Sequence, residues 1–261
     1  MAGRIGALLL RYLYLYRRSL ARSMEIFFWP VMDLLVWGFV TVYLQKLAAP
    51  RGVLFLIGAV IFWDVFYRSQ QAITLSLSEE IWVRNLLNVF IAPVRTIEIV
   101  IATCLLGVIR ATISAAVLGV LAFTLYAFDV TALGPALLPD LVSILLFGWA
   151  VGMCTMAVIL RFGHAAEALI WGTPFLLQPI SAAFYPVAVL PPVLQKVALA
   201  LPTTHVFEGM RATLATGRPA FDALLPAFAL NALYLALAGA FFGWMMGRVR
   251  EKGYLARLAM E

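Results

Sequence analysis

The amino-acid sequence predicts an all-α protein that crosses a membrane about six times. Of its 261 residues, 64% are hydrophobic and 12% are charged, whereas soluble domains carry roughly 45–50% apolar and about 25% charged residues. The apolar residues fall into runs of about 20, the length that a helix needs to cross a bilayer. A soluble core of this length cannot hide so much apolar surface, so lipid is the expected solvent.

Six apolar runs qualify as membrane-spanning helices by their length. They cover residues 26–44, 53–75, 99–126, 139–160, 167–186 and 222–247. An even number of crossings puts both termini on one side, and basic residues decide which side that is. Five arginines precede the first span and four basic residues follow the last, whereas the loop between the third and fourth spans has none. Both termini are therefore expected in the cytoplasm, and the formal charge of +6 indicates orientation and no nucleic-acid partner.

Residues 1–25 form the first predicted element, an interfacial helix that lies in the headgroup plane. On a helical wheel four arginines fall on one side and apolar residues on the other: Arg4, Arg11, Arg18 and Arg22 against Ile5, Leu9, Leu13, Tyr16 and Leu20. This separation is typical of helices at a membrane surface. An ordinary solvated helix is the alternative, but the next segment enters the membrane directly.

Residues 76–98, between the second and third spans, are expected on the cytoplasmic side and predict a short helix. Ser76 and Glu79 have the spacing of a capping box at its start, and Pro93 marks its end. An apolar stripe of helical spacing lies between them: Trp82, Leu86, Val89 and Phe90. An exposed stripe of this kind must be buried against the bilayer or a partner, and we favour a partner protein.

Residues 187–218 precede the last span and predict a re-entrant helical hairpin on the outer side. Four prolines cut the apolar pattern into two pieces that are too short to span: Pro186, Pro191, Pro192 and Pro202. Pro192 suits the first turn of one short helix, and Thr203 or Thr204 can cap the next. Irregular backbone at membrane depth must face protein or a water-filled cavity, so we expect this hairpin to border an exit route.

Several charged and aromatic side chains lie inside the predicted spans. A charge at the bilayer centre costs about 2.5–3.5 kcal/mol, so each must face protein or water. Trp63, Asp64, Tyr67 and Arg110 are candidates for a substrate path. The alternatives remain open. Charges also pair across helices or lie at interfaces near headgroups, as we expect for Asp33 and Glu167, and Trp and Tyr also form interfacial belts, which we favour for the aromatic residues.

The two connecting segments, in this order, resemble those of the permeases of the ABC-2-type exporter family, the membrane subunits of one class of ATP-binding-cassette transporters. The first segment matches the family pattern of acidic residues, a leucine-rich stretch and a proline, through Glu79, Glu80, Leu86, Leu87, Ala92 and Pro93. The second matches a proline-rich turn followed by helices, through Phe184, Pro186, Leu190, Pro191, Pro202, Glu208 and Arg211. With the spans, the resemblance covers nearly the whole chain.

The resemblance implies one permease domain over residues 1–261 in a bacterial inner membrane, paired with a second copy. A drug, a lipid, a lipid-linked glycan or a polysaccharide would leave the cytoplasm through the homodimer. Each permease would dock on a separate ATPase through the cytoplasmic coupling segment, with the N-terminal helix bracing the contact. The contact residues expected from the resemblance are Glu79, Glu80, Trp82, Arg84, Leu86 and Pro93.

The chain holds no phosphate-binding loop, which needs a Gly-Lys-Ser/Thr ending. Its only lysines, Lys46, Lys196 and Lys252, follow glutamine or glutamate. We therefore expect ATP and Mg²⁺ to be bound by the partner ATPase, and no cofactor, metal or enzymatic activity in this chain. The two histidines, His164 and His205, are predicted on opposite membrane sides, which disfavours a shared metal site.

Two other functions remain as alternatives. A carrier driven by an ion gradient should show repeated halves and broken helices at midmembrane, and residues 1–130 and 131–261 show no convincing repeat. An intramembrane enzyme needs a catalytic constellation, and the sequence carries neither a nucleophile elbow nor a zinc-protease motif.

Overall fold

The structure, a computed structural model, describes residues 1–47, 54–252 and 254, without the side chains of Ala21, Leu87 and Phe90. It is 86% helical, and the described part contains no strand. The α-helices are α1 (Ala2–Arg18), α2 (Leu20–Leu47), α3 (Phe55–Trp82), α4 (Leu86–Ile91), α5 (Thr96–Tyr126), α6 (Leu137–Phe162), α7 (Leu169–Leu177), α8 (Pro192–Leu199), α9 (Pro202–Thr216) and α10 (Leu224–Glu251). Short 3₁₀ helices connect several of them, at Val130–Ala136, Gly163–Ala166, Val187–Val189 and Phe221–Ala223. Val53, where a span was predicted to begin, and Arg257 of the basic C-terminal tail lie outside the described residues.

Four helical segments among the described residues are long and apolar enough to cross a membrane. They are Arg22–Leu47, Thr96–Tyr126, Val130–Ala166 and Phe221–Glu251. These segments contain the first, third, fourth and sixth predicted spans, which are thereby confirmed as long apolar helices. The second and fifth predicted spans are not among them, so the count of six is not confirmed.

The second predicted span lies within α3, which has a different character from the other long helices. α3 has 28 residues and is buried on nearly every face, because α2, α5 and α6 pack around it. Small residues allow α6 to approach closely: a Cβ added at Gly148 would come within 2.6 Å of the Cβ of Ser69. The hydroxyl of Ser69 donates to the carbonyl of Leu145 at 2.8 Å. A central helix can carry polar residues facing its neighbours, which lowers its hydropathy below that of a lipid-exposed span.

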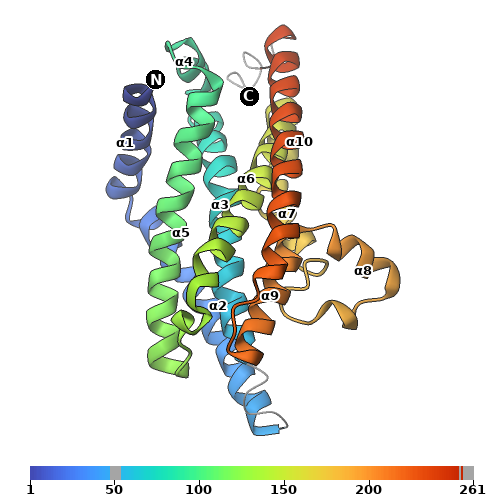
Figure 1. Ribbon diagram of the computed structural model, residues 1–261. Coiled ribbons are helices and arrows are strands. Elements are labelled where there is room, and N and C mark those ends of the chain that lie inside the picture. The colour runs from blue at the N-terminus through green and yellow to red at the C-terminus, as the bar shows by residue number, and fades with distance from the viewer. Residues whose placement is uncertain (48–53, 253, 255–261) are drawn as a thin grey trace.

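The fifth predicted span, residues 167–186, is not one continuous helix. α7 ends at Leu177, and turns lead on to the proline-rich segment. Pro179 has no backbone N–H and so cannot donate a hydrogen bond that would continue the helix. The chain then reaches the other end of the bundle through α9, after the short helix α8 (Figure 1).

Two short helices do occupy the predicted hairpin at residues 187–218. Pro192 stands in the first turn of α8, as expected. The predicted threonine cap of the second helix is wrong, because α9 begins earlier, after Leu201, and Thr203 and Thr204 lie inside its first turn. The hydroxyl of Thr204 instead donates to the carbonyl of Ser181 at 3.1 Å, which ties α9 to the end of α7.

Helices α1 and α4 lie at the same end of the bundle as the C-terminal end of α10 (Figure 1). The guanidinium of Arg250 donates to the hydroxyl of Thr96 at 2.7 Å, which joins the end of α10 to the start of α5. The two ends of the described chain therefore share one face of the protein. We call this face the α4 end.

Two clusters of buried apolar side chains fill the bundle. One lies toward the α4 end and includes Leu77 of α3, Met156 of α6 and Phe242 of α10. The other lies in the opposite half and includes Phe62 of α3 and Phe207 of α9. α3 and α6 contribute to both clusters, so they form the continuous centre of the protein.

Candidate functional site

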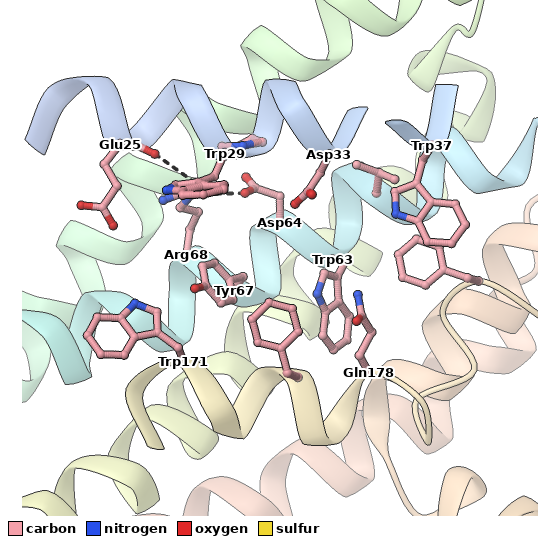
Figure 2. A pocket seen from close by; sticks show the side chains of 14 residues that line it. Glu25, Trp29, Asp33, Trp37, Trp63, Asp64, Tyr67, Arg68, Trp171 and Gln178 are labelled. Atoms are coloured by element: carbon pink, nitrogen blue, oxygen red, sulfur yellow. Dashed lines mark hydrogen bonds and ion pairs between the residues drawn. The ribbon is translucent and has the colours of Figure 1, made fainter. Parts of the chain in front are cut away.

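A pocket of about 570 Å³ lies between α2, α3 and α7 (Figure 2). Its lining consists mainly of aromatic and charged side chains, namely Glu25, Trp29, Pro30, Asp33, Trp37, Val60, Trp63, Asp64, Tyr67, Arg68, Trp171, Phe175, Gln178 and Phe184. We call it the aromatic pocket. Trp63, Asp64 and Tyr67, three of the predicted substrate-path residues, are brought together here. Trp29 and Phe175 each keep 60% of their surface exposed, so the pocket is open along the side between α2 and α7.

Each helix presents one face to the aromatic pocket. On α2 the lining residues Glu25, Trp29, Asp33 and Trp37 follow one another at intervals of four, so acids and tryptophans alternate along one stripe. α3 contributes residues at intervals of three and four, and so do α7 and the turn that follows it. The sequence shows this four-residue spacing on α2, but we did not predict from it that these residues share one surface.

The charged pair at the centre of the pocket is Asp64 and Arg68, one turn apart on α3. The Nε of Arg68 lies 3.2 Å from Oδ1 of Asp64. The other oxygen of Asp64 accepts a hydrogen bond of 2.5 Å from the hydroxyl of Ser114 on α5. Arg68 also donates to the carbonyl of Glu25 at 3.4 Å. Both side chains are buried, so this pair holds α2, α3 and α5 together as well as facing the pocket.

Most of the aromatic side chains do not form the interfacial belt that the sequence favoured. Phe62 and Phe66 are completely buried and Trp63 is 8% exposed, because α3 lies at the centre of the bundle. Trp37 stacks on Phe184, with ring centroids 4.4 Å apart and planes within 5°. This stack joins α2 to the segment after α7 and closes one end of the pocket.

Arg110, the fourth predicted substrate-path residue, does not line the aromatic pocket. It is 2% exposed, and its guanidinium has no hydrogen-bond partner among the described residues. Its Cζ lies 5.0 Å from the centroid of the Tyr16 ring of α1, a distance suited to a cation–π interaction. Arg110 therefore belongs to the contact between α1 and α5.

α1 lies along the first part of α5. Arg4 of α1 meets Glu98 of α5 at 3.5 Å, and twelve residues further along each helix Tyr16 meets Arg110. The two helices thus run side by side in the same direction for about 18 Å. The arginine-bearing side of α1 meets acidic residues of its own chain. The predicted interfacial helix is also shorter, because α1 ends at Arg18 and α2 begins at Leu20.

Arginines of α1 and α2 neutralise the acidic residues at the end of α3. Arg11 contacts Glu80 at 2.6 Å, and Glu80 also accepts a hydrogen bond of 2.6 Å from the side-chain amide of Asn85. The hydrogen bond to Glu80 raises the pKa of Arg11 above its ordinary value, so the guanidinium stays charged. Arg22 contacts Glu79 at 3.3 Å. These carboxylates are therefore engaged inside the chain.

A further contact ties α1 to the segment after α4. The guanidinium of Arg4 donates to the carbonyl of Pro93 at 2.8 Å. Glu98 accepts a hydrogen bond of 2.8 Å from the backbone N–H of Arg95, which caps the start of α5. Pro93 itself is exposed, and α4 ends just before it, as predicted.

The short helix α4 begins later than the sequence predicted. α3 continues through Ser76 to Trp82, so Ser76 and Glu79 do not form a capping box. The chain breaks at Arg84, whose φ of 55° is left-handed, and α4 begins at Leu86. Ser76 and Ser78 are buried inside the bundle, so they lie within α3 and do not start a new helix.

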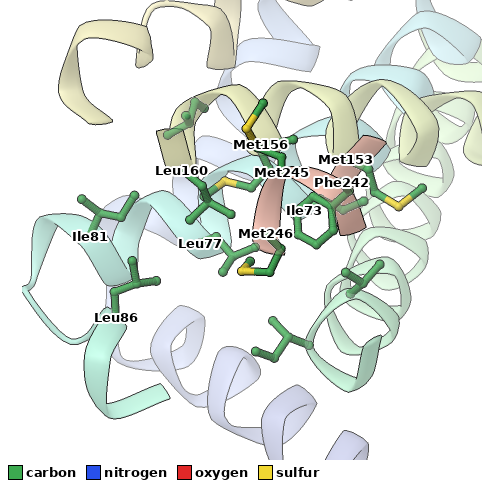
Figure 3. Close-up of a cluster of buried hydrophobic side chains, with 14 of the residues drawn as sticks. Ile73, Leu77, Ile81, Leu86, Met153, Met156, Leu160, Phe242, Met245 and Met246 are labelled. Carbon is green, nitrogen blue, oxygen red and sulfur yellow. The ribbon is translucent and has the colours of Figure 1, made fainter. Parts of the chain in front are cut away.

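Two residues of the predicted apolar stripe, Leu86 and Val89, are covered by the chain's own core, whereas Trp82 is exposed and the side chain of Phe90 lies outside the described part. Leu86 is completely buried and Val89 is 7% exposed, and Figure 3 shows Leu86 beside Ile81 of α3. The exposed apolar side chains here are Trp82, Val83 and Ile91. Of the predicted ATPase-contact residues, Glu80 and Leu86 are thus buried, Glu79 is nearly so, and Trp82, Arg84 and Pro93 remain accessible.

Glu167, at the start of the α7 region, meets the end of α3. Its carboxylate accepts a hydrogen bond of 2.5 Å from the indole N–H of Trp82 and also contacts the ring of His164. The prediction that Glu167 pairs across helices is therefore confirmed. Since α7 lines the aromatic pocket and α3 runs past it, this contact joins the α4 end to two walls of the pocket.

The proline-rich segment and α9 are tied together by one charged pair. Glu208 accepts a hydrogen bond of 2.7 Å from the backbone N–H of Val187, and its carboxylate lies 3.0 Å from Arg211. Arg211 in turn donates to the carbonyl of Ala183 at 3.1 Å. Glu208 and Arg211 therefore fix the turn that carries Phe184 into the aromatic pocket.

Comparison with known proteins found one matching family. The family model described as ABC-2 type transporter matches residues 7–215, which include most of α1, the α4 segment, the aromatic pocket and most of α9. No curated protein matches the chain.

Proposed function

The chain belongs to the ABC-2 type transporter family, and on that premise we propose that it is the permease of an exporter whose ATP is hydrolysed by a separate subunit. ATP and Mg²⁺ would be bound by that ATPase. Substrate would leave the cytoplasm through the permease, and the substrate classes considered are drugs, lipids, lipid-linked glycans and polysaccharides.

The observation that carries this proposal is the construction of the α4 end. The side chains of Trp82, Val83 and Ile91 form an exposed apolar surface, and such a surface on a soluble side marks a protein contact. Beside it, the buried Leu86 packs α4 against the core, and ion pairs from α1 and α2 hold the end of α3. A force that a partner protein applies to this surface would therefore be transmitted to α3.

α3 provides a path from the docking surface to the substrate. Trp63 in the aromatic pocket and Trp82 at the α4 end lie nineteen residues apart on the same helix, which is about 28 Å. A movement of the ATPase that tilts α3 would change the distance between the pocket walls on α2 and α3. This leverage supports an ATP-driven opening of the aromatic pocket.

The topology that we propose has six crossings with both termini in the cytoplasm of a bacterium. α3 is long enough to cross, and its polar residues face neighbouring helices and not lipid. α7 and α9 would together make the remaining crossing, and α8 with α9 would form the re-entrant hairpin that borders the exit. The basic residues at the shared end of α1 and α10 support a cytoplasmic placement of that end.

A second copy of the chain would complete the exporter. The pocket is open between α2 and α7, and the neighbouring Trp29 and Phe175 are largely exposed. A second permease facing this side would enclose the substrate between the two copies. In a two-fold symmetric pair, each copy contributes the same surface to the interface.

Reconstitution of the chain into lipid vesicles, with and without the ABC ATPase of its host, tests the proposal. We expect outward transport that requires both the ATPase and ATP, with no transport by the permease alone. Transport by the purified permease driven by an ion gradient, without any ATPase, would contradict the proposal and support a secondary transporter.

A further inference from the structure

The aromatic pocket carries more negative than positive charge. Its charged lining consists of Glu25, Asp33 and Asp64 against Arg68. Asp64 and Arg68 neutralise each other through their ion pair. The carboxylates of Glu25 and Asp33 have no hydrogen bond or ion pair within the described part of the chain. Glu25 and Asp33 are therefore the carboxylates of the lining that a cationic ligand can contact directly.

These two carboxylates lie on α2, one of the four helices that are apolar enough to cross a membrane. A charge in such a helix is costly unless it meets water or an opposite charge. The remaining cation of the lining, Arg68, is already engaged by Asp64. Figure 2 shows Asp33 on the side of α2 that faces α3 and Asp64. Asp33 is exposed beside the pocket, so a cationic ligand bound there can contact its carboxylate directly.

The rest of the pocket suits an apolar body. Besides Phe184, six aromatic side chains on three helices line the pocket: Trp29, Trp37, Trp63, Tyr67, Trp171 and Phe175. Aromatic faces bind apolar surface and also attract cations through their electron-rich rings. The volume of about 570 Å³ lies within the roughly 300–1,000 Å³ of pockets that hold drug-sized ligands.

We propose that the aromatic pocket binds an apolar organic cation, whose charge is balanced by Glu25 and Asp33 and whose apolar part packs between Trp63 and Phe175. That this cation is the cargo of the exporter rests on the proposed function, but its binding to the pocket does not require the ATPase. A sugar would bind through the hydrogen-bonding groups of the lining, such as Tyr67 and Gln178, and would need no positive charge, so it is the competing ligand class that the third probe below tests.

Tetraphenylphosphonium and tetraphenylborate provide the matched probes, since they share shape and apolar surface and differ in the sign of their charge. Binding of each ion to the purified full-length chain in nanodiscs is measured by equilibrium dialysis, with protein-free nanodiscs subtracted. We expect the cation to bind about tenfold more tightly than the anion, a difference that a single favourable charge contact supplies. A neutral disaccharide serves as a third probe and should not bind.

Variants of the carboxylates test the location of the site. Asp33→Asn and Glu25→Gln should each weaken binding of tetraphenylphosphonium by about tenfold, whereas Asp33→Glu, which keeps the charge, should retain most of it. Asp222→Asn is the matched control, because Asp222 is an exposed aspartate far from the pocket lining. Size-exclusion chromatography of each variant separates loss of binding from loss of folding.

Equal binding of the two tetraphenyl ions, tighter binding of the disaccharide, or unchanged cation binding by Asp33→Asn and Glu25→Gln would overturn the inference. Selective cation binding without ATP-driven transport would contradict the exporter proposal and leave the site standing. Conversely, ATP-driven transport of another substrate without selective cation binding would leave the exporter standing and overturn the cation site.

Discussion

The α4 end and the aromatic pocket lie along the same helix, α3, but their acidic side chains differ in their partners. At the α4 end Glu79, Glu80 and Glu98 each meet an arginine of α1 or α2. In the pocket only Asp64 has such a partner, and Glu25 and Asp33 have none among the described residues. Charges that hold a fold together are paired within the chain, whereas unpaired charges beside a cavity indicate a ligand.

The comparison predicts that substitutions at the α4 end change stability and that substitutions of the unpaired pocket residues change binding. Leu86→Ala should have the largest effect on stability, because this side chain is completely buried between α4 and α3. We expect a loss of about 3 kcal/mol, within the usual cost of a buried leucine-to-alanine cavity. Thermal unfolding in detergent measures it. Ile91→Ala on the same helix is the control, since Ile91 is 79% exposed and should change stability by less than about 0.5 kcal/mol.

Arg11→Ala should be the next most destabilising change. It leaves the carboxylate of Glu80, which is 2% exposed, with the amide of Asn85 as its remaining partner. Breaking a buried pair costs about 3–5 kcal/mol, and since Arg11 itself is 37% exposed, we expect about 2 kcal/mol after solvent screening. Arg17→Ala, which removes an exposed arginine of the same helix, should leave the unfolding temperature unchanged; equal losses in the two variants would argue against a structural role for the Arg11–Glu80 pair.

Trp82→Ala should affect coupling more than stability. Trp82 is 40% exposed and contacts Glu167 through its indole N–H. We expect the number of substrate molecules moved per ATP hydrolysed to fall about tenfold, the effect of losing about 1.4 kcal/mol of contact. Reconstituted transport and ATPase rates, measured together, give this ratio. Leu138→Ala, an exposed apolar residue at the other end of the bundle, should keep the ratio of the unmodified chain.

Asp33→Asn should have the smallest effect on stability of the four changes. Since the carboxylate has no partner within the described residues, its removal breaks no contact of the fold. We expect the free energy of unfolding to change by less than about 0.5 kcal/mol, measured without ligand by thermal unfolding. A loss as large as that of Arg11→Ala would mean that Asp33 is a structural charge, and the distinction between the two regions would fail.

The four long apolar helices were predictable from sequence, and the more polar central helix α3 was not. α2, α5, α6 and α10 are apolar over most of their length because lipid or apolar neighbours surround them, and each was predicted within a few residues. α3 is surrounded by protein, so it contains Asp64, Arg68 and a run of serine and glutamine residues that lower its hydropathy. The spacing of Ser76 and Glu79 predicted a helix start, but α3 continues to Trp82 because tertiary packing around it outweighs the local preference.

For the candidate sites, sequence reasoning identified residues but not their partners. Glu79, Glu80 and the N-terminal arginines were each singled out, yet their pairing depends on α1 lying along α5, which a helical wheel does not show. Trp63, Asp64 and Tyr67 were predicted together and do share one pocket. Arg110 does not line this pocket and is buried beside Tyr16 of α1.

The most direct test of an ATPase docked at the α4 end is site-specific photocrosslinking in the intact membrane. A photoreactive side chain is placed at position 91 on α4 or at position 138 at the start of α6, both of which are exposed apolar sites at opposite ends of the bundle. We expect a crosslink to the ABC ATPase subunit from position 91 and none from position 138. A crosslink from position 138 alone, or from neither position when the two subunits are purified together as a complex, would contradict docking at the α4 end.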